Sequence, residues 1–321
     1  MPARIVLLVT SPRLPAGLLT AAAWDAVRQF PVFTAAESEQ SDALRHAGVP
    51  VTVVDPDPER LLAELAGREA VVWLSGPAGD QDFARQLGLR LTREPDRAEL
   101  ELMYGSWDPP GARLLDAVTV MDRLASPGGD PWKRAQTHRT LAQYLLEESY
   151  EAFDAIESDD LGALREELGD VLLQVVLHAR LAEEIPDGAA WGIDDVAGDL
   201  VDKMVRRNPH VFAGAEVTGI DEITENWERI KKAEKSRDSV LDGIALSQPA
   251  LSLAAKILQR AERAGLGVPL PGGDDLGPAL FRVVAEARAA GVDAEAELRR
   301  AALEYAEEVR SAEQKNVGPA E

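Results

Sequence analysis

The chain has 321 residues, of which 45% are hydrophobic and 28% are charged, with no cysteine and a formal net charge of −22. This size predicts about two globular domains, and the lack of cysteine excludes disulfides, thiolate catalysis and cysteine-based zinc sites. The acidity argues against nucleic-acid polymers and anionic membranes as partners, so an anionic ligand should be small and met by local cations or a metal. The longest early apolar run, residues 5–9, is too short for a signal peptide or a membrane span, and we therefore expect a cytoplasmic protein.

Residues 1–105 are expected to form a small α/β domain. Short β-branched segments bounded by Gly, Pro or Asp predict strands at residues 4–10, 50–55 and 70–75. A helical stretch at residues 58–65 lies between two of these strands. Strands that alternate with helices favour a parallel sheet.

Residues 112–236 should form an all-α domain, because they show helical periods and no strand pattern. Thr137 is a predicted N-cap, and a turn at residues 158–162 separates two long helices. The first long helix should bury one face, made of Leu141, Leu145, Ala152 and Ile156. The second should bury another, made of Leu168, Val171, Leu172, Val175 and Ala179. Further helices are predicted at about residues 112–124, 194–208 and 221–235.

Residues 237–321 are helical in pattern and resemble part of the preceding domain. The segments 167–180 and 275–288 are identical at seven of fourteen positions, which predicts an internal repeat. The second copy has Pro278 in place of Asp170, and nothing before it matches the acidic segment of the first copy. We therefore expect a degenerate repeat that keeps its packing residues and loses its acids.

Two pairs of acids carry the chemistry that we predict. Glu148 and Glu151 are three residues apart and share one helix face, as do Glu167 and Asp170 on the next helix. Because a short turn makes the two helices antiparallel neighbours, the pairs can converge. Four carboxylates this close cannot all stay ionised without a cation, and all-oxygen ligands suit Mg²⁺ or Mn²⁺. Glu147 could act as an outer-shell group or as a base.

The same acids are compatible with two alternative roles. They could form a solvated acidic face on a non-catalytic helical interaction or scaffold protein, which is the usual fate of Glu clusters. A di-iron helical bundle also pairs acids, but it uses a Glu-x-x-His motif that neither Glu148 nor Glu167 provides.

Cations that could meet phosphate groups follow the acids along the chain. Lys203, Arg206 and Arg207 occupy positions i, i+3 and i+4 near a predicted helix end, where they could bind polyphosphate or complement the helix dipole. Trp227 and Lys231 are four residues apart, so they could contact a base and a phosphate, or be a core tryptophan and a solvated lysine. The three histidines of this region are isolated in the sequence and are expected to be structural, namely His138, His178 and His210.

Over about residues 112–235 the motifs resemble, in order and spacing, the MazG-type nucleoside triphosphate pyrophosphohydrolases. The motifs are Pro131-Trp132, Gln136-Thr137-His138, Leu146-Glu-Glu-Ser-Tyr-Glu151, Glu167-Leu-Gly-Asp170, Lys203-x-x-Arg-Arg207, Pro209-His-Val-Phe212 and Trp227-x-x-x-Lys231. The resemblance implies a mainly all-α helical bundle, here preceded by the small α/β domain, that forms a homodimer or a higher homo-oligomer. It also implies the Mg²⁺-dependent reaction NTP + H₂O → NMP + PPi, often on non-canonical or damaged nucleotides.

Carried over position by position, the resemblance also assigns roles to individual residues. The implied metal ligands are Glu148, Glu151, Glu167 and Asp170, and Glu147 becomes an outer-shell or water-orienting group. The implied catalytic residues are Glu147, Glu148 and Glu151. The implied nucleotide contacts are Lys203, Arg206, Arg207, Trp227 and Lys231.

The N-terminal region resembles the start of a tetrapyrrole methylase domain at residues 5–20. That family has a Gly-rich turn after its first strand, which lets the backbone approach S-adenosylmethionine. Here residues 10–14 read Thr-Ser-Pro-Arg-Leu and contain no glycine. About 105 residues are also roughly half of what such a domain needs, so we expect a degenerate remnant without methyl transfer.

Overall fold

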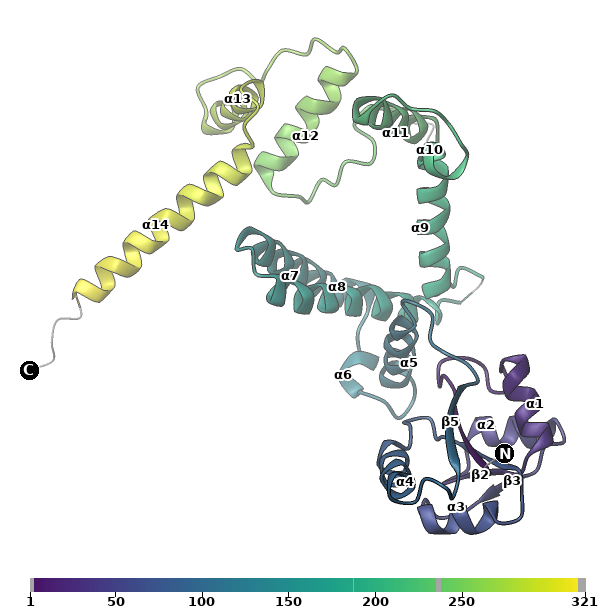
Figure 1. The fold of residues 1–321 in the computed structure, drawn as a ribbon. Coiled ribbons are helices and arrows are strands. Elements are labelled where there is room, and N and C mark those ends of the chain that lie inside the picture. The colour runs from purple at the N-terminus through teal and green to yellow at the C-terminus, as the bar shows by residue number, and fades with distance from the viewer. Residues whose placement is uncertain (1–2, 187, 235–237, 317–321) are drawn as a thin grey trace, which may run out of the picture. The chain divides into compact units, whose positions relative to one another are not determined.

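The protein is described by a computed structural model that covers residues 3–186, 188–234 and 238–316 (Figure 1). Two compact units, Met1–Val201 and Asp202–Glu321, are each described by themselves below. The predicted end of one helix at Lys235 and the predicted domain boundary at residues 236 and 237 lie outside the described residues. The three predicted domains stay predictions.

The N-terminal part of the first unit contains one five-stranded sheet, in which every pair of neighbouring strands is parallel. The strands are β1 (Arg4–Val9), β2 (Val32–Thr34), β3 (Val51–Val53), β4 (Ala70–Leu74) and β5 (Glu99–Tyr104), in the order β3-β2-β4-β1-β5. The register sets Ile5 of the central β1 opposite Val71 on one side and Leu100 on the other. The predicted parallel sheet is confirmed, and β2 and β5 are the two strands that the sequence did not reveal.

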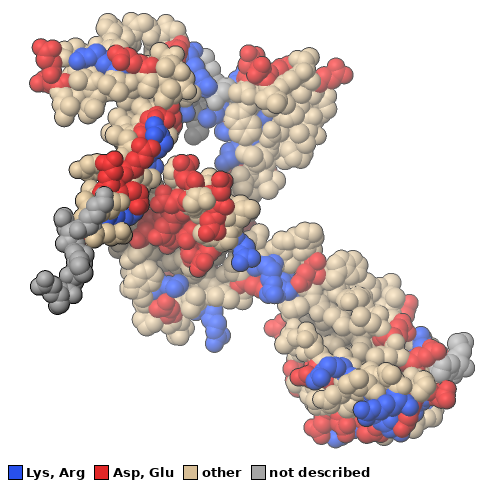
Figure 2. Space-filling view, turned by 60° about the vertical axis from the view of Figure 1, so that its left-hand side comes forward, with Lys and Arg blue, Asp and Glu red and all other residues tan. Residues whose placement is uncertain are grey.

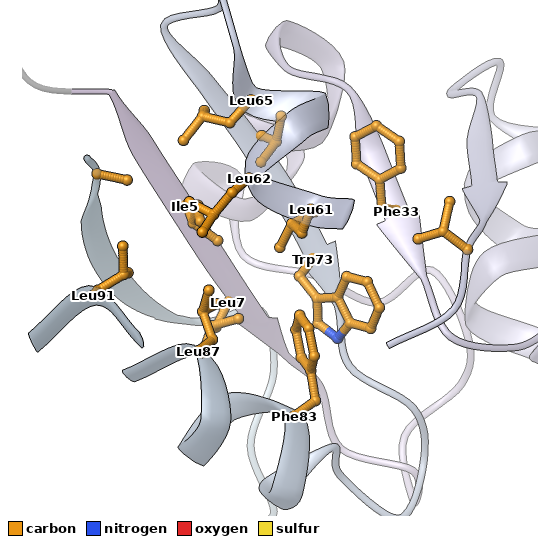
Figure 3. Packing of buried hydrophobic residues seen from close by; sticks show 13 residues of the cluster. Ile5, Leu7, Phe33, Leu61, Leu62, Leu65, Trp73, Phe83, Leu87 and Leu91 are labelled. Atoms are coloured by element: carbon orange, nitrogen blue, oxygen red, sulfur yellow. The ribbon is translucent and has the colours of Figure 1, made fainter. Parts of the chain in front are cut away.

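Helices cover both faces of this sheet (Figure 1). α1 (Ala21–Gln29) and α2 (Glu39–His46) pack on one face, and α3 (Pro58–Leu65) and α4 (Gln81–Arg93) pack on the other. The core under α3 and α4 is built around the fully buried Trp73, which stacks on Phe83 with ring centroids 4.1 Å apart (Figure 3). The indole Nε1 of Trp73 donates a hydrogen bond to Asp80 at 2.8 Å, so its polar atom is satisfied.

The rest of the first unit is helical. It contains α5 (Arg113–Ala125), the short α6 (Pro131–Arg134), α7 (His138–Glu157) and α8 (Leu161–Ala182). The predicted N-cap Thr137 is confirmed, because its side chain accepts a hydrogen bond from the Thr140 backbone N–H in a capping box. α7 and α8 are joined by a tight turn in which Asp159 has a φ of 56°. The next residue, Asp160, caps α8 by accepting from the backbone N–H groups of Gly162 and Ala163.

The buried face of the α7–α8 hairpin differs in part from the predicted one. Leu141 and Ala152 are buried as expected, but Ile156 and Leu168 are each 53% exposed. The core instead contains Ala155, Gln174, Val176 and Leu177. α8 packs against both α7 and α5, and Met121 and Ala125 of α5 cluster with Val176 and Leu177. Its buried face is therefore wider near its C-terminal half and turned away from Leu168.

The second unit is all-helical over its described residues. α9 (Ile193–Arg207) enters it and is followed by α10 (Pro209–Phe212), α11 (Ile220–Glu234), α12 (Ala250–Arg263), α13 (Leu276–Ala289) and α14 (Ala294–Asn316). The last three pack on one another, with Ala254 and Val284 buried between them. Among the described helices, none has the length and apolarity needed to cross a lipid bilayer. The fold class is thus the predicted one, a small α/β domain followed by a mainly α-helical region.

Candidate active site

The α7–α8 hairpin brings the predicted acids of two helices to one place. α7 and α8 lie side by side (Figure 1), and His138 at the start of α7 contacts His178 near the end of α8, so the helices are antiparallel. One carboxylate oxygen from each of Glu148, Glu151 and Glu167 lies within 4.8 Å of the others. These three residues and Asp170 are called the acidic cluster below. The convergence that the sequence predicted for the first three is therefore present.

Asp170 and Glu147 flank these carboxylates. The Asp170 side chain is half-buried and lies near enough to Glu148 and Glu167 to act on them electrostatically. Glu147 is exposed and acts on Glu148 in the same way. A patch of acidic side chains is visible over α7 and α8 in Figure 2. All five predicted acids of the hairpin are thus in one neighbourhood.

The surroundings make ionisation of the cluster unfavourable. Burial raises the pKa of Glu148, and the nearby charges of Asp170, Glu151 and Glu147 raise it further. Burial likewise raises the pKa of Glu167, with added repulsion from Glu151 and Asp170. A divalent cation bound among these carboxylates would relieve the repulsion. Oxygen-only ligands of this kind suit Mg²⁺ and Mn²⁺.

The predicted phosphate-binding cations belong to the second unit. Arg206 and Arg207 at the end of α9 both form ion pairs with Glu234 of α11, at 2.7 and 2.6 Å. These arginines lower the pKa of Glu234 to about 2. The guanidinium of Arg207 also lies over the ring of Trp227, 5.3 Å from its centroid. Arg206, Arg207 and Trp227 are therefore brought together as predicted, around an acid that the sequence analysis did not single out.

The remaining predicted contacts, Lys203 and Lys231, are half-buried on α9 and α11. The acidic cluster lies in the first unit and the cations lie in the second, and each unit is described on its own. A single site that contains both sets of residues therefore stays a prediction.

Two of the histidines that are isolated in the sequence meet in the structure, a pairing that the sequence analysis did not predict. His138 and His178 face each other with their Nδ1 atoms 2.7 Å apart. His138 also lies near the ring of Trp191, at 6.2 Å between centroids and 14° between planes. A signal was present in the sequence, because His138 lies ten residues before Glu148 and His178 eleven after Glu167. In an antiparallel hairpin whose acids meet, the two histidines must then meet as well.

The chain is similar in sequence to known proteins of one family. Residues 136–212 match the family described as the MazG nucleotide pyrophosphohydrolase domain. The chain is 50% identical over 220 residues to an uncharacterized 26.1 kDa protein of Streptomyces cacaoi, covering 68% of this chain and 90% of that protein. It is 41% identical over 250 residues to a nucleoside triphosphate pyrophosphohydrolase of Mycobacterium tuberculosis, covering 77% of this chain and 70% of that one. The crystal structure of a MazG-related protein from Thermotoga maritima matches 36% of this chain and 97% of its own, at 25% identity and a TM-score of 0.32.

The chain is therefore a member of the MazG family of nucleotide pyrophosphohydrolases. The matched segment contains the whole acidic cluster, the histidine pair and the cations at the end of α9. The acids and the basic end of α9 thus lie within the part of the chain that defines the family.

Proposed function

We propose that this protein hydrolyses nucleoside triphosphates to nucleoside monophosphates and pyrophosphate, with Mg²⁺ held by the acidic cluster and Mn²⁺ able to replace it. The observation that carries the proposal is the approach of Glu148, Glu151 and Glu167 to within 4.8 Å of one another. Support for the reaction comes from the relative in Mycobacterium tuberculosis, which is named a nucleoside triphosphate pyrophosphohydrolase.

The donor set fits a hard divalent cation. The cluster offers carboxylate oxygens alone, from two helices, and no described histidine or thiol joins them within ligand distance. Burial and mutual repulsion raise the pKa values of Glu148 and Glu167, which is the electrostatic condition that a bound cation relieves. Asp170 would complete the ligand set from the second helix.

The metal and the acidic side chains would have different roles in the reaction. When bound, the metal neutralises phosphate oxygens and lowers the pKa of a coordinated water. The exposed Glu147 next to the cluster would orient the attacking water or accept its proton. The carboxylates of Glu148 and Glu151 would hold the metal, and the bound metal would keep the polyphosphate in position relative to that water.

The cations of the second unit would serve the leaving group and the nucleoside. Lys203, Arg206 and Arg207 carry three positive charges on one end of α9, which suits the charge that develops on pyrophosphate. Glu234 forms ion pairs with both Arg206 and Arg207, and a polyphosphate that binds these guanidinium groups would compete with it. Trp227 and Lys231 would contact the base and a phosphate.

The biological substrates that we propose are non-canonical or damaged nucleotides, and the proposed assembly is a homodimer or a higher homo-oligomer. Exposed apolar side chains on α7 are consistent with a further protein surface packing there, since Leu146, Tyr150 and Ile156 are 58%, 43% and 53% exposed.

A panel of NTPs and dNTPs, incubated with Mg²⁺ or EDTA and resolved by chromatography, tests the reaction. We expect monophosphate and pyrophosphate as products, lost with EDTA and lost in Asp170→Ala. The matched control is Asp154→Asn, which removes an exposed acid of α7 outside the cluster and should keep full activity. Diphosphate and orthophosphate would show that the bond assignment is wrong, and no turnover with either metal would favour a scaffold protein.

A further inference from the structure

The interface between α7 and α8 contains polar side chains where apolar ones would pack better. Asp170, Gln174 and His178 follow one another at intervals of four residues on α8, so they share the face that meets α7. Gln174 is only 4% exposed, and its Oε1 has no hydrogen-bond partner among the residues that the structure describes. The Nε2 atom of His178 is likewise buried without a partner. Buried polar atoms without partners destabilise a fold, so a function of these side chains would explain why they are present.

His138 and His178 form a well-defined pair at the open end of the hairpin. Their ring planes are parallel within 4°, with centroids 5.1 Å apart, and the two Nδ1 atoms are 2.7 Å apart. This is a hydrogen bond in which one imidazole donates and the other accepts. Burial lowers the pKa of His178, so that it is neutral and can take part in such a bond at pH 7. Outside the acidic cluster, it is the one side-chain hydrogen bond identified between the described residues of α7 and α8.

The force that this bond must resist comes from the acidic cluster itself. Glu148 and Glu151 on α7 repel Glu167 and Asp170 on α8, and that repulsion pushes the helices apart or out of register. A slip of one turn moves a helix by about 5.4 Å along its axis. That distance exceeds the 4.8 Å within which the three carboxylates now lie. Apolar contacts alone tolerate such slips better than a hydrogen bond does.

We propose that His138 and His178 are positioning residues, whose mutual hydrogen bond fixes the register of α7 against α8 and so keeps the acidic cluster at ligand distance. The predicted repeat is consistent with this role. In the predicted repeat, α13 has Glu286 at the position of His178 and Pro278 at the position of Asp170. Asp170 and His178 are thus both replaced in the second copy.

The first test measures metal binding directly and rests on the proposed metal site. Mn²⁺ is titrated into the full chain and followed by electron paramagnetic resonance. His138→Phe and His178→Phe keep ring volume but lose the bond, and each should weaken Mn²⁺ binding by about tenfold, the lower range for residues that orient ligands. The double variant should be no weaker than either single one, because both changes remove the same bond. Additive losses, or no loss, would overturn the proposal.

Two further variants separate positioning from general packing. Gln174→Leu removes an unsatisfied buried oxygen from the same interface but no cross-helix bond, so it should raise the Tm and leave Mn²⁺ affinity within about twofold. His138→Gln retains a donor and an acceptor and should recover most of the affinity. If Gln174→Leu weakens Mn²⁺ binding as much as the histidine variants do, any change in the interface loosens the cluster and the histidines have no special role.

The second test needs no metal and uses the lack of native cysteine. Leu145 and Val171 lie one heptad from His138 and His178, so cysteines at both positions report the native register. Cysteines at Leu145 and Val175 report a register shifted by one turn. The native pair should oxidise at least about tenfold faster than the shifted pair, and this ratio should fall towards one when both histidines are Phe. An unchanged ratio would show that the apolar core alone sets the register.

The two tests fail separately. If the unaltered chain binds no Mn²⁺ but the cross-linking ratio depends on the histidines, the metal site is wrong and the positioning role stands. If Mn²⁺ binds equally to all variants and the ratio is unchanged, the positioning role is wrong and the metal site stands.

Discussion

The α7–α8 hairpin and the helix pair α12–α13, which carries the predicted repeat, differ at the position of Asp170. α8 begins at Leu161, so Asp170 lies in its third turn, whereas α13 begins at Leu276 and Pro278 lies in its first turn. Proline is tolerated in a first turn, where its missing N–H has no partner to lose, but not in a helix interior. α13 therefore has about two turns fewer than α8 before this position, and a metal site like that of α8 would need those turns.

The residues that pack α8 and α13 against neighbouring helices are more alike. Val176 and Val284 occupy matching positions in the predicted repeat and are 4% and 1% exposed. Arg180 and Arg288 also match, and each binds an acid of a neighbouring helix, Asp122 and Glu262 respectively. α13 thus keeps a buried valine and an ion-paired arginine at the positions that match α8, although Pro278 stands in place of Asp170. Substitutions at matching positions of α8 and α13 should therefore differ in their effects on stability and activity.

The largest effect is expected from exchanging the residues that separate the hairpins. Asp170→Pro would place a proline inside α8, remove a backbone hydrogen bond and cost about 3 kcal/mol or more. Pro278→Asp in the first turn of α13 should change stability by less than about 1 kcal/mol. Thermal and urea unfolding followed by circular dichroism measure both. Equal losses in the two variants would contradict the view that only the first hairpin needs a long uninterrupted helix.

The next largest effect is expected at the acidic cluster, where removing one charge should raise stability and lower activity. Glu148→Gln removes one of several repelling charges, so the metal-free protein should have a higher Tm, and the rise in Tm produced by Mg²⁺ should shrink. Turnover should fall by on the order of 100-fold or more. The control is Glu286→Gln on the exposed face of α13, which should change neither quantity. A lower metal-free Tm in Glu148→Gln would contradict the repulsion.

A pH dependence follows from the raised pKa values of Glu148 and Glu167. Each carboxyl holds its proton more tightly in the folded chain than in the unfolded one, where the pKa is about 4.3. Their stabilising contribution is therefore fully present below about pH 4.3 and is lost as the pH rises through the raised folded values. In EDTA, the difference in urea midpoint between the unaltered chain and Glu148→Gln/Glu167→Gln should grow towards neutral pH.

Other ionised groups also change the free energy of unfolding with pH. The difference in urea midpoint between the unaltered chain and the double variant isolates the contribution of Glu148 and Glu167. Millimolar Mg²⁺ at pH 7 should reduce the difference, because the cation offsets the repulsion. A difference that is constant between pH 4 and pH 7 would contradict the electrostatic account of the cluster.

The smallest effect is expected at the helix caps. Asp160 caps α8 with two hydrogen bonds to backbone N–H groups, and Asp160→Ala should cost about 1 kcal/mol. Asp275 occupies the equivalent N-cap of α13 without a side-chain hydrogen bond, so Asp275→Ala should cost much less. Paired urea titrations measure the difference. A larger loss at Asp275 would show that the cap contacts described for the two helices are misassigned.

Features set by short-range chemistry were predictable from the sequence. The Thr137 capping box depends on residues three apart, and the strands β1, β3 and β4 are β-branched runs with clear ends. β2 has only three residues, and β5 contains Glu99 and Glu101, a residue type that is depleted in strands, so neither resembles the β-branched runs of the other strands. Periodicity also misplaced Ile156 and Leu168, since a helix period cannot tell which neighbouring helix covers which face.

The candidate site was predictable to the extent that one hairpin builds it. The spacing of Glu148, Glu151 and Glu167 decides which side of each helix they lie on. The short turn decides which residues of α7 lie opposite which residues of α8, so the approach of the three carboxylates followed from local rules. The pairing of Arg206 and Arg207 with Glu234 did not, because it depends on how α9 packs against α11. The burial of Gln174 is likewise a property of helix packing that no spacing rule reports.

The most direct test of the central claim is anomalous diffraction from a crystal of the protein soaked with Mn²⁺. We expect a peak in the α7–α8 hairpin, with oxygens of Glu148, Glu151 and Glu167 about 2 Å from the ion. Oxygens of Asp170 should bind the same ion or one beside it. A crystal with Mn²⁺ bound elsewhere, or with no peak among these carboxylates, would contradict the claim that this hairpin is the metal-binding centre.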